Sequence, residues 1–494
     1  MIRRILLLLG ILSLPTMAQA EWHKAVTNHF EIYADENAAW LHDYAEKLER
    51  YDSAARQLRG LPDDAGAAAR RVTVYLVPRA EFGNLAPKGI GGFYSGRATG
   101  SVIFMPGREN DEVLFHEYTH HQLALAWAGI AIPGWLNEGM AQVQSTAEFR
   151  PDGSVVFGRE LEYVQYMLAD MDTSEMTKML SKTTVSTGDV NYYSIGWLLT
   201  HMLTFSDKRA GELPQYIVAV NKGQTLEEAA ETAFGGLRKL GSDLQKYRRA
   251  SSLPGVVIPA DRITIGPIEV TKLTPGGAAT ILDTMHSRAG VDEEKAAELY
   301  GKAIKDAEPY PDDAGAQRML AEAAFDAHAF QTAYDAAERA IAADAATAGA
   351  HYYKALAMRE LGMEAEEQRA VIDEGLRHRP DDPALMQLYY NIYAESDQPV
   401  PLIAKTYLVA AYQLAPQDPE LRFRTGHMLL AEGKPDQARA VLRPLAFSVH
   451  RSKTAERALA AITAIEDGDV ELALAELQKA EEEDEAQEGE SADE

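Results

Sequence analysis

The heptapeptide HEYTHHQ, residues 116–122, concentrates three histidines and one glutamate in two helical turns. The preceding residues NDE, 110–112, and the apolar pattern after them are typical of a helix start with an N-cap and an acidic first turn. On a helix that advances by about 100° and 1.5 Å per residue, His116 and His120 differ by about 40° and 6 Å, so both imidazoles point the same way. The segment therefore predicts a helix that presents two histidines to one metal ion.

A glutamate beside this pair and a second glutamate further along complete the pattern. Glu117 is displaced from His116 by one residue, so it would lie beside a metal ion and reach a water molecule without being a ligand. Glu138, in WLNEGMAQ (135–142), follows eighteen residues after His120, and a helix, a turn and an antiparallel return would bring it back to the histidines. Two histidines and one glutamate leave a fourth position open, which is typical of a hydrolytic zinc and not of a structural one.

His121 offers a rival histidine pair, because HEYTHH also fits the spacing HExxxH. That spacing needs a distorted helix, since an undistorted one turns His121 by about 100° away from His120. We therefore select His116 and His120 as the ligands and expect His121 to pack, cap or line the cleft.

HEYTH followed by GWLNEGMA resembles the gluzincin branch of the zincin metallopeptidases, and most closely the peptidase-MA-like group. The resemblance covers about residues 30–210 and implies an α+β zincin-like fold. It also implies His116, His120 and Glu138 as zinc ligands and Glu117 as general base.

Two further positions are interpreted through this resemblance. Thermolysin-like relatives have an aspartate four residues after the ligand glutamate to orient a histidine, whereas this chain has Gln142, so that support must come from another group or be weaker. A tyrosine that stabilises the oxyanion is also implied, and VNYYSIGWLLTHML, 190–203, supplies one. We choose Tyr193, while Tyr192 and a purely packing role stay open. His201 on the same helix is expected to be a core or surface histidine.

The N-terminal half, residues 21–250, has a mixed α and β pattern. HFEIYAD (29–35) and RVTVYLV (71–77) predict strands, and the charged amphipathic stretch 36–59 predicts a helix between them. The glycine-rich segment 87–107 runs into β-like residues and not into a helix, so we expect a turn followed by a strand and no phosphate loop.

The strand expected at residues 101–105 precedes the HEYTH helix directly. On that position alone, it is our hypothesis for the edge strand that pairs with an extended peptide substrate.

The C-terminal half has a different sequence pattern. SSLPGVVIPADRITIGPIEVTKLTPGG, 251–277, predicts a linker or small β element at a domain boundary. Residues 278–480 form alanine-rich amphipathic patterns, in which Ala333, Ala438 and Ala473 recur at multiples of about 35 residues. This half resembles an all-α tetratricopeptide-repeat solenoid of four or five repeats, with a generic helical bundle as the alternative. Such a solenoid implies a concave face that binds peptides or proteins.

The two ends of the chain and its charge limit the location and the partners. Residues 1–20 combine two arginines, an apolar run and a small-x-small site, which predicts a signal peptide cleaved before Glu21 and no permanent membrane anchor. A periplasmic or secreted location follows, and the absence of cysteine excludes disulfides and thiolate sites. The net charge of −27 argues against nucleic acid as a partner. Residues 481–494, with nine carboxylates and no base, predict an acidic disordered tail.

The leading hypothesis is an exported metallopeptidase that uses Zn²⁺, with Glu117 and Tyr193 as catalytic residues and repeats that recruit a protein substrate or partner. The first alternative is an adaptor or chaperone that acts through its repeats and whose peptidase site is weak or inactive, motivated by Gln142. The second is a peptidase-plus-repeat protein of outer-membrane quality control, although such proteins have a much longer gap to the third ligand.

Overall fold

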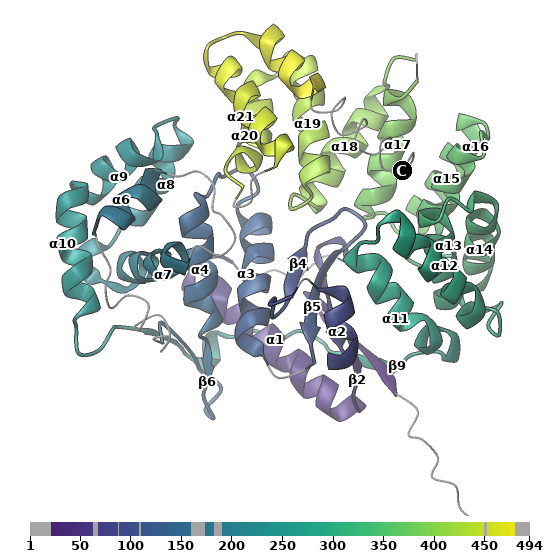
Figure 1. The fold of residues 1–494 in the computed structure, drawn as a ribbon, viewed down its shortest axis with the longest axis horizontal. Helices are drawn as coiled ribbons and strands as arrows, with labels where there is room; N and C mark the ends of the chain where they lie inside the picture. Colours follow the sequence, from purple (N-terminus) through teal and green to yellow (C-terminus); the bar gives the residue numbers. More distant parts are fainter. Residues whose placement is uncertain are drawn as a thin grey trace, which may run out of the picture.

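The computed structural model describes residues 21–62, 68–86, 88–107, 110–159, 173–181, 190–396, 398–448 and 452–479. The expected signal peptide, 1–20, and acidic tail, 481–494, lie outside these residues. In Figure 1 the N-terminal half, purple to teal, combines sheet and helices, and the C-terminal half, green to yellow, is an arc of paired helices that curves along it. Within the described residues, no helix is both long enough and apolar enough to cross a membrane.

A six-stranded mixed sheet forms the centre of the N-terminal half, in the order β4-β5-β3-β2-β1-β9. The strands are β1 (Trp22–Val26), β2 (Phe30–Asp35), β3 (Val72–Val77), β4 (Phe93–Ser95), β5 (Ser101–Pro106) and β9 (Glu269–Lys272). β2, β3 and β5 run parallel to one another, and β1, β4 and β9 are antiparallel to the strands beside them. The predicted strands at 29–35, 71–77 and 101–105 are confirmed.

β5 is an internal strand, so the hypothesis that residues 101–105 form the edge is wrong. It pairs with β3 on one side and with β4 on the other. The glycine-rich segment does not form a simple turn before β5, because it also contains the short strand β4, whose residue Phe93 pairs with Phe104. β4 therefore takes the outer position, close to the helix that carries HEYTH.

The two faces of the sheet bury different partners because strand side chains alternate. Ile32, Val74 and Ile103 are fully buried on the face covered by α1 (Ala38–Leu58), the helix predicted at 36–59. That helix begins after Asn37, whose side chain accepts a hydrogen bond from the backbone N–H of Trp40 at 3.0 Å. The opposite face presents aromatic and polar residues to the first helices of the C-terminal half.

A second core gathers six N-terminal helices around Trp135, Trp197 and Tyr216. These helices are α4 (Gly134–Ser145), α6 (Thr173–Ser181), α7 (Val190–Phe205), α8 (Glu212–Asn221), α9 (Leu226–Phe234) and α10 (Leu237–Arg248). Residues 251–277 contain two short strands that join N-terminal sheets. β8 (Val256–Ile258) pairs with β7 (Val155–Phe157), and β9 pairs with β1.

The C-terminal half consists of consecutive helix pairs. Its helices are α11 (Pro275–Ala289), α12 (Glu293–Ala307), α13 (Ala314–Asp326), α14 (Phe330–Ala343), α15 (Ala350–Glu360), α16 (Ala365–His378), α17 (Pro383–Ala394), α18 (Leu402–Leu414), α19 (Pro419–Ala431), α20 (Pro435–Ala446) and α21 (Lys453–Glu466), followed by helical residues 470–479. Ala333, Ala438 and Ala473 are fully buried in second helices, as the repeat spacing predicts. The described residues form six helix pairs, which is more than the four or five repeats expected from the sequence. In the α11–α12 pair, Ala296 lies buried at the equivalent place, four residues after the N-cap of α12.

Candidate metal centre

The helix that carries HEYTH, α3 (Asp111–Ala126), begins as its sequence predicts. Asn110 is the N-cap, and its side chain accepts a hydrogen bond from the backbone N–H of Val113 at 3.4 Å. Asp111 and Glu112 occupy the first turn, where negative charge is stabilised by the positive end of the helix dipole. The helix is undistorted enough to place His116 and His120 on one side.

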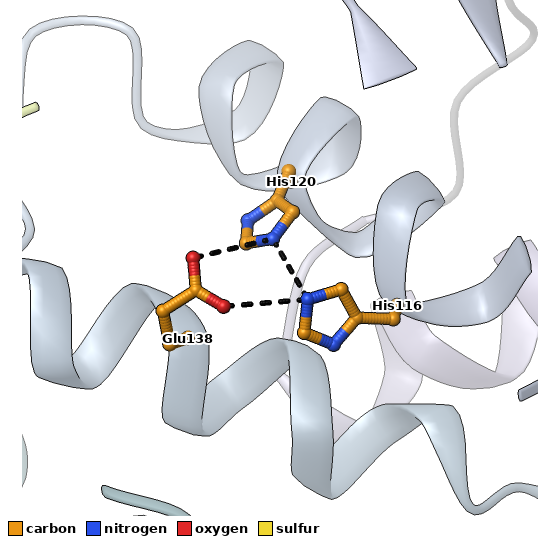
Figure 2. Close-up of side chains that lie close together, drawn as sticks. All are labelled: His116, His120 and Glu138. Carbon is orange, nitrogen blue, oxygen red and sulfur yellow. Dashed lines mark hydrogen bonds and ion pairs between the residues drawn. The ribbon is translucent and has the colours of Figure 1, made fainter. Parts of the chain in front are cut away.

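His116, His120 and Glu138 converge on one point, as Figure 2 shows. The two Nε2 atoms of the histidines are 3.2 Å apart, and Glu138 places Oε2 at 3.3 Å from His116 Nε2 and Oε1 at 3.7 Å from His120 Nε2. Zinc bonds of about 2.0–2.1 Å in a tetrahedron separate neighbouring ligand atoms by roughly 3.3–3.5 Å. The donor types and their spacing fit a zinc ion, and these three residues could hold a metal.

Close packing of α4 on α7 brings Glu138 to the histidines. Gly139 faces α7 so closely that a Cβ atom there would lie 2.6 Å from the carbonyl oxygen of Gly196 and would clash with the Thr200 hydroxyl. Trp135 anchors the same helix, because it is fully buried and donates from its indole N–H to the Tyr216 hydroxyl at 3.1 Å. The predicted antiparallel return from α3 is therefore fixed by a contact that only glycine permits.

The centre is open on one side. The side chains of His116 and His120 are 16% and 19% exposed, whereas that of Glu138 is 6% exposed. Burial lowers the pKa of His116, but the hydrogen bond and charge of Glu138 outweigh burial and leave the pKa raised. The carboxylate is thus held at the base of the centre, and the two histidine side chains are partly exposed to solvent.

Glu117 lies beside the centre and is half-buried. Burial raises the pKa of its carboxyl, and Glu138 adds to the rise, whereas His116 and His120 oppose it without cancelling it. A hydrogen bond from the backbone of Tyr94, in strand β4, also lowers the pKa. Glu117 therefore has a raised pKa and a direct link to the edge strand.

Asn137 supports His120 and was not found from the sequence. The Nδ1 atom of His120 is 2.9 Å from Asn137 Oδ1. Because an amide oxygen only accepts hydrogen bonds, Nδ1 carries the proton and Nε2 is left free to bind metal. An aspartate at position 142 would orient a ligand histidine. Here Asn137, the residue directly before Glu138, orients His120 instead.

His121 turns away from the centre, as helix geometry predicts. It is 1% exposed, its Nδ1 atom is 3.0 Å from the Tyr94 hydroxyl, and its Nε2 atom is 3.0 Å from the carbonyl oxygen of Arg70. Burial lowers its pKa to about 4. His121 therefore packs as a neutral side chain that ties α3 to β4.

A buried carboxylate that the sequence did not reveal holds the opposite side of α3. Asp52 of α1 accepts hydrogen bonds from the Tyr118 hydroxyl and from Arg56 Nε, both at 2.8 Å, and from the Gln122 amide. His29 lies 3.5 Å away and approaches Glu49 at 2.9 Å. These contacts fix the rotation of α3 and so the direction of its histidines.

The tyrosines and the histidine of α7 have distinct surroundings. Tyr192 is buried, and Tyr193 is half-buried against the helical core one turn before Gly196. His201 is fully buried between the Tyr247 hydroxyl, 2.8 Å from Nδ1, and the carbonyl oxygen of Gly158, 3.0 Å from Nε2. His201 is thus a core histidine, as expected.

Comparisons with known proteins find matches among solved structures. No protein-family model and no curated protein matches the chain. The C-terminal helical region is similar to the solved structure titled "Functional Characterization of Pseudomonas Aeruginosa pilF", at 17% identity over 41% of this chain and 88% of that chain, with a TM-score of 0.34. Support for the repeat interpretation comes from this chain's own helix pairs.

Proposed function

We propose that this chain is an exported zinc-dependent metallopeptidase. The observation that carries the proposal is the convergence of His116, His120 and Glu138, with an accessible side and Glu117 next to them. A zinc ion held by these residues would supply Lewis acidity and lower the pKa of a water molecule towards neutrality.

Three residues of the chain then have separate roles in the proposed reaction. Glu117 accepts a proton from the attacking water and returns it to the leaving amine, and its raised pKa suits both steps. Asn137 keeps His120 in the tautomer that a metal ion needs. Tyr193 donates a hydrogen bond to the oxyanion, a role supported by its helix packing directly on the helix of Glu138.

Strand β4 is the proposed docking edge for the substrate. It ends the sheet order, so its outer side pairs with no other strand of the described residues. Tyr94 in this strand reaches Glu117 through its backbone, which places the edge beside the proton acceptor. An extended peptide added to this edge would run past the metal centre.

We further propose that the repeats recruit protein substrates or partners, and that the signal peptide directs the chain to the periplasm or outside the cell. A face of paired helices suits protein binding. This role is independent of peptide hydrolysis.

Peptide cleavage by the wild type and by Glu117→Gln tests the proposal. Removal of a general base costs about 10²–10⁴ in rate, whereas zinc content should not change. Glu112→Gln is the matched control, because Glu112 lies on the same helix and is exposed. A wild type that holds zinc but cleaves peptides no faster than Glu117→Gln would exclude the peptidase and favour the adaptor alternative.

A further inference from the structure

The metal centre lies where two hydrophobic cores of the N-terminal half meet. His116 and His120 belong to the part of α3 that packs in the core of the six-stranded sheet, where Phe115 is buried. Glu138 belongs to α4, which packs in the helical core around Trp135. The distances between the three candidate ligands therefore depend on how the two cores are held relative to each other.

The last helix pairs of the C-terminal half contact both of these cores. On the sheet side, Ala98 in the β4–β5 loop is buried in the core of the last helices, and the Gln417 side chain donates to the Ser101 hydroxyl at 2.9 Å. On the helical side, Phe447, directly after α20, packs against the core around Trp135. Figure 1 shows these helices over the ends of α3 and α4. The last helices thus connect the two cores.

The α3–α4 turn, residues 127–133, is bound in its first half by two side chains of α18 and α19. Arg422 Nη1 donates to the carbonyl oxygen of Ala128 at 2.6 Å, and the Tyr412 hydroxyl donates to the same oxygen at 3.2 Å. The Arg422 guanidinium lies over the Tyr412 ring, 5.3 Å from its centroid, and Nη2 donates to the carbonyl oxygen of Pro416 at 2.6 Å. Because Arg422 is buried, these charge-assisted hydrogen bonds are stronger than they would be at the surface.

The second half of the α3–α4 turn is linked to α20 through one residue of α8. Asn221 accepts a hydrogen bond from the backbone N–H of Ala131 and donates one to the carbonyl oxygen of Ala131, both at 2.9 Å. Arg443 of α20 donates from Nη1 to the carbonyl oxygen of Asn221, and its Nη2 atom is 2.6 Å from Glu466. The last helices therefore hold the turn between His120 and Glu138 at both of its halves.

We propose that helices α18–α20 position the metal centre and that Arg422 is the positioning residue. Arg422 fixes the α3–α4 turn to helices that also contact the β4–β5 loop and the helical core. It thereby keeps His120, before the turn, at the distance from Glu138, after the turn, that one metal ion requires. Arg422 touches neither metal nor substrate and acts through the backbone of the turn. The inference rests on the proposed zinc centre and makes the last repeats a part of its construction.

Zinc affinity of the full chain, measured by competition with a chelator, tests the positioning role. Arg422→Met should weaken zinc binding about tenfold, the lower end of the range for residues that support metal ligands, and Arg422→Lys should recover part of the loss. Arg209→Met is the control, because Arg209 is also buried but pairs with Glu212 and Asp243. It should lower stability and keep the zinc affinity of the wild type. Equal zinc affinity in Arg422→Met and wild type would overturn the positioning role.

Hydrogen exchange in the metal-free protein tests the contact with the turn separately. Tyr412→Phe is a milder variant, because it removes one of the two donors to Ala128 and leaves Arg422 in place. Amides of residues 127–133 should exchange faster in Tyr412→Phe than in the wild type. Tyr407→Phe, on the same helix but with its ring against Tyr389, should exchange as the wild type does.

Unchanged exchange at residues 127–133 in both Tyr412→Phe and Arg422→Met would overturn the proposal that the last helices hold the turn. Absence of zinc from the wild type would instead contradict the proposed function, since the exchange comparison needs no metal ion.

Discussion

The Nδ1 atom of His120 lies 2.9 Å from the Oδ1 atom of Asn137, the residue directly before Glu138. One helical turn thus supplies both a proposed metal ligand and the group that orients another. Loss of such supporting hydrogen bonds costs about 10- to 100-fold in metal affinity. Asn137→Ala should weaken zinc binding by this factor in a competition titration with a chelator, while Asn137→Asp, which keeps an acceptor, should retain most of it. Equal affinities for Asn137→Ala and wild type would show that the contact does not orient His120.

Gly139 sets the distance between α4 and α7, and therefore the position of Glu138. A Cβ atom at this position meets the backbone of Gly196, which cannot move aside as a flexible side chain can. We expect Gly139→Ala to lower the free energy of unfolding by about 1–3 kcal/mol and to reduce zinc content. Gly129→Ala is the control, because a Cβ atom there meets nothing within 4 Å. Comparable denaturation midpoints for the two variants would contradict the close contact between α4 and α7 at Gly139.

Asp418 joins the C-terminal helices to the loop before β5. Its Oδ1 atom accepts from the backbone N–H of Leu421 at 2.8 Å as the N-cap of α19, and its Oδ2 atom accepts from that of Ala98 at 2.6 Å. Asp292 caps α12 in the same way at 2.9 Å but is exposed. Loss of a cap costs about 0.5–2 kcal/mol, and a buried N–H without a partner adds about 1–3 kcal/mol.

Asp418→Ala should therefore destabilise the protein more than Asp292→Ala in urea denaturation. It should also speed amide hydrogen exchange in residues 93–101, which include β4, whereas Asp292→Ala should leave these amides unchanged. Identical exchange in both variants would mean that the C-terminal helices do not restrain this segment.

His29 makes the anchoring of α3 dependent on pH. Burial lowers its pKa, but the hydrogen bond that His29 donates to Glu49 and the charge of Asp52 outweigh burial, so the pKa is raised above 6.5. The stabilisation that protonated His29 gives to the folded state is complete below about pH 6.5. It is lost as the pH rises through the folded-state pKa of His29. The free energy of unfolding should fall more steeply from about pH 6 to pH 8 in the wild type than in His29→Gln. If the free energy of unfolding changes with pH in the same way in both proteins, His29 does not contribute to this pH dependence.

The sequence predicts the parts of the centre that follow from local geometry. Helix period alone selects His116 and His120 and turns His121 into the core, and Asn110 marks the helix start correctly. The same local signals identify three strands and the spacing of the helix pairs. These features depend on residues within a few positions of one another, so one chain segment contains the information.

Features that depend on contacts between distant segments could not be predicted. Asp52 is 66 residues from Tyr118, and nothing in its helix distinguishes it from a surface carboxylate. The short strand β4 has three residues, too few for a period-two pattern, so β5 was assigned to the edge. Asn137 lies within the segment WLNEGMAQ, 135–142, but its role depends on the return of α4 onto α3.

The metal content of purified protein tests the central claim most directly. Mass spectrometry under native conditions, after equilibration with zinc, should give about one zinc ion per chain for the wild type. Glu138→Gln should bind little or none, while Glu148→Gln, an exposed glutamate of strand β6 (Glu148–Phe149), should bind as the wild type does. Equal zinc content in Glu138→Gln and wild type, or no zinc in the wild type, would contradict the assignment of this centre.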